Sequence, residues 1–136
     1  MDKTQQELLF KLSMFEQQIQ NLQQQLRAVE EGMIDIGTLK EGLDEIKNSV
    51  GREIVAPLGR GIFVNAKLSS DDLIVDVGGR NLVKKSVQET KEIIGEQLKK
   101  LEEIRKEINL KLDETDKELT RIISEAAESE DNKNKG

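Results

Sequence analysis

The sequence lacks histidine, cysteine, tryptophan and tyrosine, and it has one proline and three phenylalanines among 136 residues. The commonest proton shuttle, the thiol nucleophile and the preferred transition-metal ligands are therefore missing. We expect no enzyme, no cofactor and no metal site. The absence of cysteine also excludes a disulfide-stabilised secreted scaffold. With 2% aromatic and 35% charged residues, the composition indicates an elongated molecule without a large round core.

Long apolar runs are missing as well. The N-terminal MDKTQQELLF contains no signal-peptide core, and no run approaches the roughly 18 apolar residues of a membrane span. The net charge of −6 argues against a phosphate-binding surface for nucleic acid. We therefore expect a soluble cytoplasmic protein that binds neither membrane nor nucleic acid.

What the sequence does contain is a heptad pattern at each end. Apolar residues spaced alternately four and three apart form a stripe, here called the seam, that stays on one side of a helix only if the helix supercoils around a partner. The first seam consists of Leu8, Leu12, Phe15, Ile19, Leu22, Leu26, Val29, Met33 and Ile36. The second consists of Val87, Ile94, Leu101, Ile108, Thr115 and Ile122, with Leu98, Ile104, Leu112, Leu119 and Ala126 as companions.

The first seam contains one irregularity. Leu39 follows Ile36 by a second consecutive step of three before Leu43 resumes the pattern. Such a stammer overwinds a coiled coil locally. Gly32, Gly37 and Gly42 surround it, which predicts either a bend or merely a weaker helix held by its partner.

Between the helices the apolar period changes from 3.5 to 2, which is typical of strands. The alternation predicts strands at 62–68 and 73–77, joined as a hairpin by the polar residues Ser69 to Asp72. Short strands at 54–58 and 82–85 would flank this pair. Pro57 fits best at a strand end or edge.

The predicted fold class is α+β: a long antiparallel coiled coil with two central β-hairpins. Residues 1–50 would form the first helix, 51–85 the strands, 86–127 the second helix and 128–136 a disordered tail. Because the strand segment returns the chain near its starting point, the two ends of the chain would meet at the far end of the coil, the coil tip.

The strand segment has exposed edges and too little apolar area to be stable alone. We expect the same segment of other subunits to cover it, closing an oligomeric β-barrel; the alternative is that the strands pack only on the base of their own coil. The expected assembly residues are Val55, Leu58, Gly59, Gly61, Phe63, Ala66, Leu68, Leu73, Val75 and Val77.

Several apolar residues near the coil tip lie off the two seams, where they could offer an adaptable surface to apolar segments of other proteins. These candidate client-binding residues are Leu9, Phe10, Met14, Ile123 and Ala127. Alternatively, they close the tip or contact a neighbouring coil.

The segments APLGRGIFVNAKL (56–68) and LIVDVGGRNLVKK (73–85) resemble the double hairpin of the prefoldin alpha-type subunit, in which long heptad helices also bracket the hairpins. Gly59, Gly61, Phe63, Ala66 and Leu68 match that pattern position by position. The resemblance implies an ATP-independent co-chaperone, a hetero-hexamer of two alpha and four beta-type subunits with a strand barrel. It further implies that the coiled coils capture unfolded proteins and deliver them to a group II chaperonin. A different hypothesis is a structural coiled-coil adaptor or tether that docks one folded partner.

Overall fold

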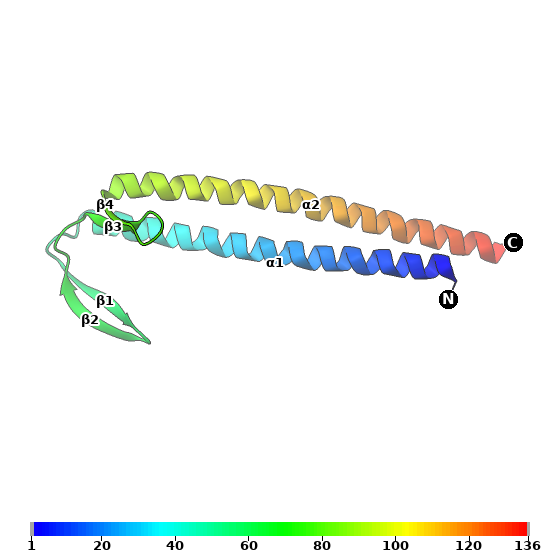
Figure 1. Cartoon of the computed structure of the whole chain (residues 1–136), viewed down its shortest axis with the longest axis horizontal. Helices are drawn as coiled ribbons and strands as arrows, with labels where there is room; N and C mark the ends of the chain where they lie inside the picture. Colours follow the sequence, from blue (N-terminus) through cyan, green and yellow to red (C-terminus); the bar gives the residue numbers. More distant parts are fainter. Residues whose placement is uncertain (1, 136) are drawn as a thin grey trace. The chain divides into compact units, whose positions relative to one another are not determined.

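The computed structural model describes the backbone of residues 2–135 and the side chains of residues 2–128. The elements follow one another as α1 (Lys3–Ile46), β1 (Glu53–Gly59), β2 (Ile62–Lys67), β3 (Leu73–Asp76), β4 (Leu82–Lys85) and α2 (Val87–Lys135) (Figure 1). The chain divides into two compact units, residues 1–32 with 101–136, here the tip unit, and residues 33–100, here the base unit. Neither helix contains, within the described residues, a stretch apolar enough to cross a membrane.

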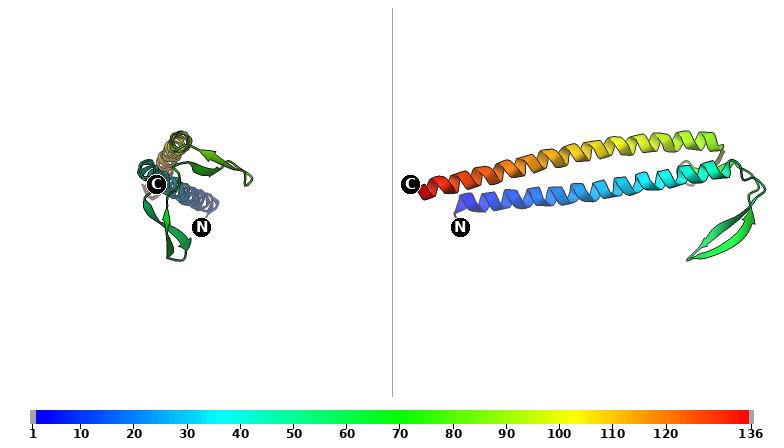
Figure 2. Two further views of the ribbon diagram at one scale, coloured as in Figure 1. Left: turned by 90° about the vertical axis from the view of Figure 1, so that its left-hand side faces the viewer. Right: turned by 180° about the vertical axis from the view of Figure 1, so that it is seen from behind.

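In the tip unit the N-terminal part of α1 and the C-terminal part of α2 run side by side in opposite directions (Figure 2). The predicted seams face each other there. Leu22 and Ile108 are buried, and so is Thr115, while the seam positions closer to the chain ends are half-buried. Gly32 allows close approach of the helices, because a Cβ atom at this position would lie 3.3 Å from Leu101 Cδ1.

In the base unit the apolar core is small and lies between the two helices. Leu43, Val87 and Ile94 are buried, and Ile36, Ile46 and Leu73 pack against them. The first five of these are helix residues at or next to the predicted seams, whereas Leu73 comes from β3. One hairpin is therefore anchored to the coil of its own chain.

Two predicted seam residues do not belong to the packed stripe. Leu39 is 47% exposed and Ile104 is 42% exposed. The reason is that the packed positions repeat strictly every seven residues. Leu43 follows Ile36 by seven residues, and the half-buried Arg105 follows Leu98 by seven, so Leu39 and Ile104 fall outside the packed positions. α1 continues as a helix past Leu39 to Ile46.

The strand pairing differs from the predicted one. β1 pairs with β2 and β3 pairs with β4, both antiparallel, so there are two separate hairpins, and the predicted hairpin between β2 and β3 is wrong. The polar residues from Ser69 to Asp72 connect the two hairpins instead of forming a turn within one. The expectation of two central hairpins is confirmed, with Leu68 and Val77 just outside the strands.

The turns explain this pairing. In the first, Arg60 and Gly61 have φ values of 53° and 79°; in the second, Gly79 and Arg80 have φ values of 59° and 62°. Positive φ at both central residues is the requirement of the two-residue turn whose twist matches antiparallel strands. The second turn is closed by the amide of Asn81, which donates to the carbonyl of Gly78 at 3.0 Å.

The helix boundaries are set by local hydrogen bonds and by the absence of a stop signal. At the start of α1, the Asp2 carboxylate accepts from the amide of Gln5 at 2.8 Å, and the amide of Asp2 donates to the Gln5 side chain at 3.3 Å. At the other end, α2 continues to Lys135, past the boundary predicted at residue 127 and into the segment predicted as a disordered tail. No glycine or proline stands between Ala127 and Lys135 to end it.

Candidate functional sites: the hairpin surface and the coil tip

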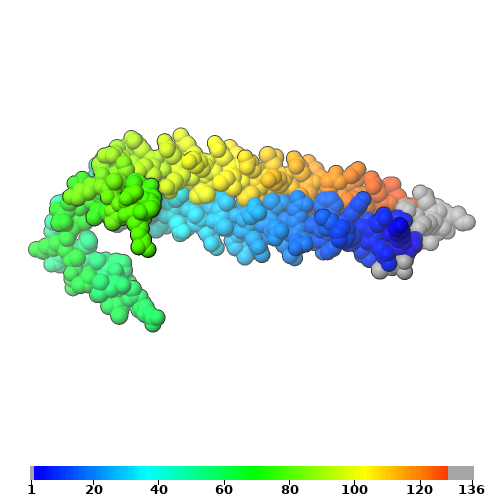
Figure 3. Space-filling view, in the orientation of Figure 1, coloured from blue at the N-terminus to red at the C-terminus, as the bar shows by residue number. Residues whose placement is uncertain are grey.

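The β1–β2 hairpin exposes apolar side chains on both of its faces. Cross-strand partners share a face, so Ile54 and Val64 lie on one side and Phe63 on the other, opposite Pro57. Phe63 is 59% exposed. Neither face is covered by a helix in the views of Figure 2, and Figure 3 shows the hairpin open to solvent on the visible side.

The β3–β4 hairpin is different, because one of its faces is partly covered. Leu73 and Val75 are half-buried and share the face that packs toward the base of the coil. Ile74 and Leu82 lie on the opposite face and are exposed. The alternative in which strands pack on their own coil therefore applies to one face of one hairpin only.

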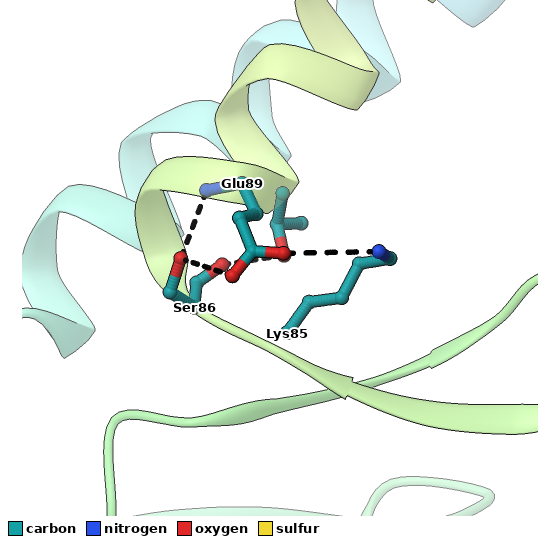
Figure 4. Close-up of polar contacts among 4 residues, drawn as sticks. Lys85, Ser86 and Glu89 are labelled. Atoms are coloured by element: carbon teal, nitrogen blue, oxygen red, sulfur yellow. Dashed lines mark hydrogen bonds and ion pairs between the residues drawn. The ribbon is translucent and has the colours of Figure 1, made fainter.

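A local network fixes the junction between β4 and α2. Ser86 Oγ accepts the amide of Glu89 at 3.0 Å and lies 3.2 Å from the Glu89 carboxylate, to which it donates (Figure 4). The carbonyl of Ser86 accepts from the Thr90 hydroxyl at 2.9 Å. Lys85, which is half-buried, approaches the exposed Glu89 at 3.8 Å and forms a weak pair with it. This helix cap sets the direction in which the strand leaves the coil.

The expected assembly residues fall into an exposed group and a half-buried group. Five of them, on or beside β1 and β2, are exposed: Val55, Leu58, Gly59, Gly61 and Phe63. Val77 is exposed too, whereas Ala66, Leu68, Leu73 and Val75 are half-buried in their own chain. The prediction omitted six further exposed apolar residues of the two hairpins: Ile54, Ile62, Val64, Ile74, Leu82 and Val83. We call all exposed apolar side chains of the two hairpins the hairpin surface.

At the coil tip all five predicted client-binding residues are exposed, but they do not form one patch. An open groove of about 360 Å³ runs between the helices of the tip unit, and Met14 is the only one of the five that lines it. The seam residues Phe15 and Ile122 also line this groove, here the Met14 groove.

Leu9, Ile123 and Ala127 lie on the other side of the coil. Leu9 comes one residue after the seam residue Leu8, whereas Met14 comes one residue before the seam residue Phe15. At 3.6 residues per turn, these two steps turn the side chains of Leu9 and Met14 to opposite flanks of the seam. The same geometry turns Ile123 and Ala127 away from the flank of Glu118 and Glu125, which line the Met14 groove. Phe10 is on the outer face of α1. The tip therefore presents apolar groups all around the coil.

The polar residues of the Met14 groove come mainly from α2. Arg121 pairs with Glu118 at 2.7 Å and approaches Glu125 at 3.8 Å. The hydrogen bond that Arg121 donates to Glu118 and the charges of both carboxylates raise the pKa of Arg121 above its usual value. Lys11 and Gln18 complete the lining from α1. Such a groove can hold an apolar side chain in contact with Met14 and Phe15 and leave polar groups of the same ligand at the rim.

The chain consists of two heptad helices joined by two hairpins with exposed apolar side chains, and comparison with known proteins gives its class. The chain belongs to the prefoldin family, whose subunit model matches residues 15–130. Within that family it is an alpha-type subunit, because its curated relatives carry that name. Prefoldins are non-enzymatic chaperones, so the chain belongs to a family of chaperone subunits.

Two relatives and one solved structure show the similarity. Prefoldin subunit alpha of Methanosphaera stadtmanae is 31% identical over 88 residues, which cover 65% of this chain and 64% of that relative. Prefoldin subunit alpha of Methanococcus vannielii is 32% identical over 115 residues, which cover 84% of this chain and 77% of that relative. Among solved structures, filamentous PFD from Methanocaldococcus jannaschii has the same fold, with a TM-score of 0.75 at 20% identity, covering 85% of this chain and 97% of that chain.

Proposed function

We propose that this subunit captures unfolded proteins at its coil tip, without ATP and without catalysis, and transfers them to a group II chaperonin in the cytoplasm. The proposal combines membership of a chaperone family with one observation of the structure: apolar side chains at the tip remain exposed although the helices are paired there. A weakly structured ligand can contact such separated apolar groups one at a time, which suits many unrelated clients.

We propose that the hairpin surface is the site of assembly with other subunits. The exposed apolar side chains on both faces of β1–β2 and on the outer face of β3–β4 need cover from other subunits. We propose a hetero-hexamer of two alpha and four beta-type subunits whose hairpins close a β-barrel. Assembly would then use the hairpins in the middle of the sequence and client capture the residues near its two ends, so the two functions would respond separately to mutation.

Aggregation assays test client capture. Several unrelated denatured proteins are diluted into the assembled chaperone without nucleotide, and light scattering is recorded. We expect protection of all of them, and a strong loss of protection when Leu9, Phe10 and Ile123 are changed together to Ser. Leu110→Ser is the control, because Leu110 is an exposed apolar residue of α2 in the tip unit that does not belong to the predicted client-binding residues.

The outcomes of the aggregation assays distinguish a chaperone subunit from a structural adaptor or tether. Protection of a single partner, or of none, would favour a structural adaptor. If the triple variant protects clients as well as the parent, client capture takes place elsewhere on the assembly. Handover is tested by adding a group II chaperonin with ATP, which should release the client in folded form.

A further inference from the structure

A second groove of about 360 Å³ lies in the tip unit, and none of the five predicted client-binding residues lines it. Its lining consists of Ile19 and Gln23 from α1 with Leu112, Asp113 and Asp116 from α2. Asp116 and Glu118 of the Met14 groove are two positions apart, about 200° around the helix. The two grooves therefore open on different sides of the coil, and we call this one the Leu112 groove.

The Leu112 groove combines an apolar floor with an acidic rim. Ile19 and Leu112 are half-buried seam residues, and no basic side chain lines the groove. Asp113 is engaged by Lys117 at 3.1 Å, an exposed pair that holds it weakly. Asp116 has no ion-pair partner among the described side chains. The Met14 groove differs in this respect, because Arg121 and Lys11 line it beside its two glutamates.

The tip unit around the Leu112 groove carries a net negative charge, as the rim of the groove does. The tip unit contains 16 acidic and 10 basic residues, whereas the base unit contains 11 of each. The whole net charge of −6 therefore belongs to the unit that carries the grooves. Excess negative charge around a site raises the local concentration of cationic ligands and speeds their association.

We propose that the Leu112 groove is a specificity site for unfolded segments in which an apolar side chain is followed closely by Lys or Arg. The apolar side chain contacts Ile19 and Leu112, and the cation reaches Asp116 and Asp113 at the rim. This inference rests on the proposed capture of unfolded proteins and adds a sequence preference to it. Exposed ion pairs are individually weak, so the preference is a bias among clients and not an absolute requirement.

Peptide binding tests the preference. The full chain, assembled with its partner subunits, is titrated with labelled peptides of equal length that contain leucine with lysine, leucine with glutamine, leucine with glutamate, or glycine with lysine, and fluorescence anisotropy is measured. We expect leucine–lysine to bind roughly 2- to 10-fold more tightly than leucine–glutamate at low salt, with the difference shrinking as salt screens the rim.

Substitution at the rim provides the matched comparison. Asp113→Asn with Asp116→Asn should bring the leucine–lysine affinity down to that of leucine–glutamine and leave the latter peptide unchanged. The control is Asp35→Asn with Glu41→Gln, which removes the same charge from exposed positions of α1 in the base unit. The control variant should keep the preference, and helical circular dichroism should be equal in both variants.

Three results would overturn the inference. Equal binding of leucine–lysine and leucine–glutamate by the parent, with aggregation suppression intact, removes the specificity site but leaves the proposed function standing. Equally tight binding of glycine–lysine would mean that the acidic surface recognises charge alone, as for a folded basic partner. Failure of every leucine peptide to bind, together with no protection of clients, would overturn both the inference and the proposed function.

Discussion

Two phenylalanines of similar exposure allow assembly and client binding to be separated by the same substitution. Phe63, on β2, is 59% exposed, and Phe10, in the coil tip, is 67% exposed. We expect Phe63→Ser to weaken assembly and to spare the coil, and Phe10→Ser to spare assembly and to weaken client protection. Because the chemical change is identical, general effects of losing a surface aromatic cancel in the comparison.

The size of the assembly effect follows from the area that Phe63 leaves for a partner. A fully covered Phe removes roughly 150–250 Å² from water, so 59% exposure leaves on the order of 100 Å² to be buried by another subunit. At about 25 cal/mol per Å² this corresponds to roughly 2–4 kcal/mol. The dissociation constant of a contact that covers Phe63 should therefore rise on the order of 100-fold.

Sedimentation velocity over a concentration series with the partner subunits measures this change, and helical circular dichroism verifies that the coil is intact. Phe63→Ser should shift the mass distribution toward free subunits at concentrations where the parent and Phe10→Ser remain assembled. If both variants assemble like the parent, the hairpin surface does not hold the subunits together. If Phe10→Ser dissociates the assembly, the tip contributes to subunit contacts and the assignment of roles is wrong.

Three further predictions concern stability, each measured by helical circular dichroism. Gly37→Ala should stabilise α1 by about 0.8–1 kcal/mol, because a Cβ atom there meets nothing within 4 Å. Gly61→Ala should instead destabilise its turn, because Gly61 has a φ of +79°. A lower thermal unfolding midpoint for Gly37→Ala than for the parent would contradict the first expectation. Leu22→Ala should cost about 2–5 kcal/mol, since it leaves a cavity in the seam; an unchanged melt would show that the helices are not paired there. The hydrogen bond from Lys91 lowers the pKa of Asp44 below 3.8. The stabilisation from a lowered carboxyl pKa is present above the unfolded-state pKa and is lost as the pH falls through the folded-state pKa. Asp44→Asn should therefore be less stable than the parent near neutral pH but not at a pH well below 3.8. An equal difference in stability at both pH values would refute the pairing of Asp44 with Lys91.

The sequence alone determined that two long heptad helices flank a strand-forming segment, although not where the helices end. Heptad spacing depends only on residues three and four positions apart, so it can be read locally, and the seam residues from Leu8 to Ile36 pack as predicted. The change to a period of two located β2 within a residue of its observed end. The exposure of the five tip residues also followed from their displacement from the seams.

The tertiary structure decided which strands pair and which surfaces remain open. The alternation of apolar residues has a period of two whichever neighbouring strand a strand pairs with. It therefore did not distinguish the predicted β2–β3 hairpin from the observed pairs β1–β2 and β3–β4. The positive φ values at Arg60 and Arg80 identify the turns of the observed hairpins. Docking of Leu73 on the coil, and the exposure of Ile74 behind it, depend on residues distant in sequence. The grooves likewise arise only where two helices meet: Leu112 lies across from Ile19 because the helices are antiparallel, and no local pattern in either helix contains that juxtaposition.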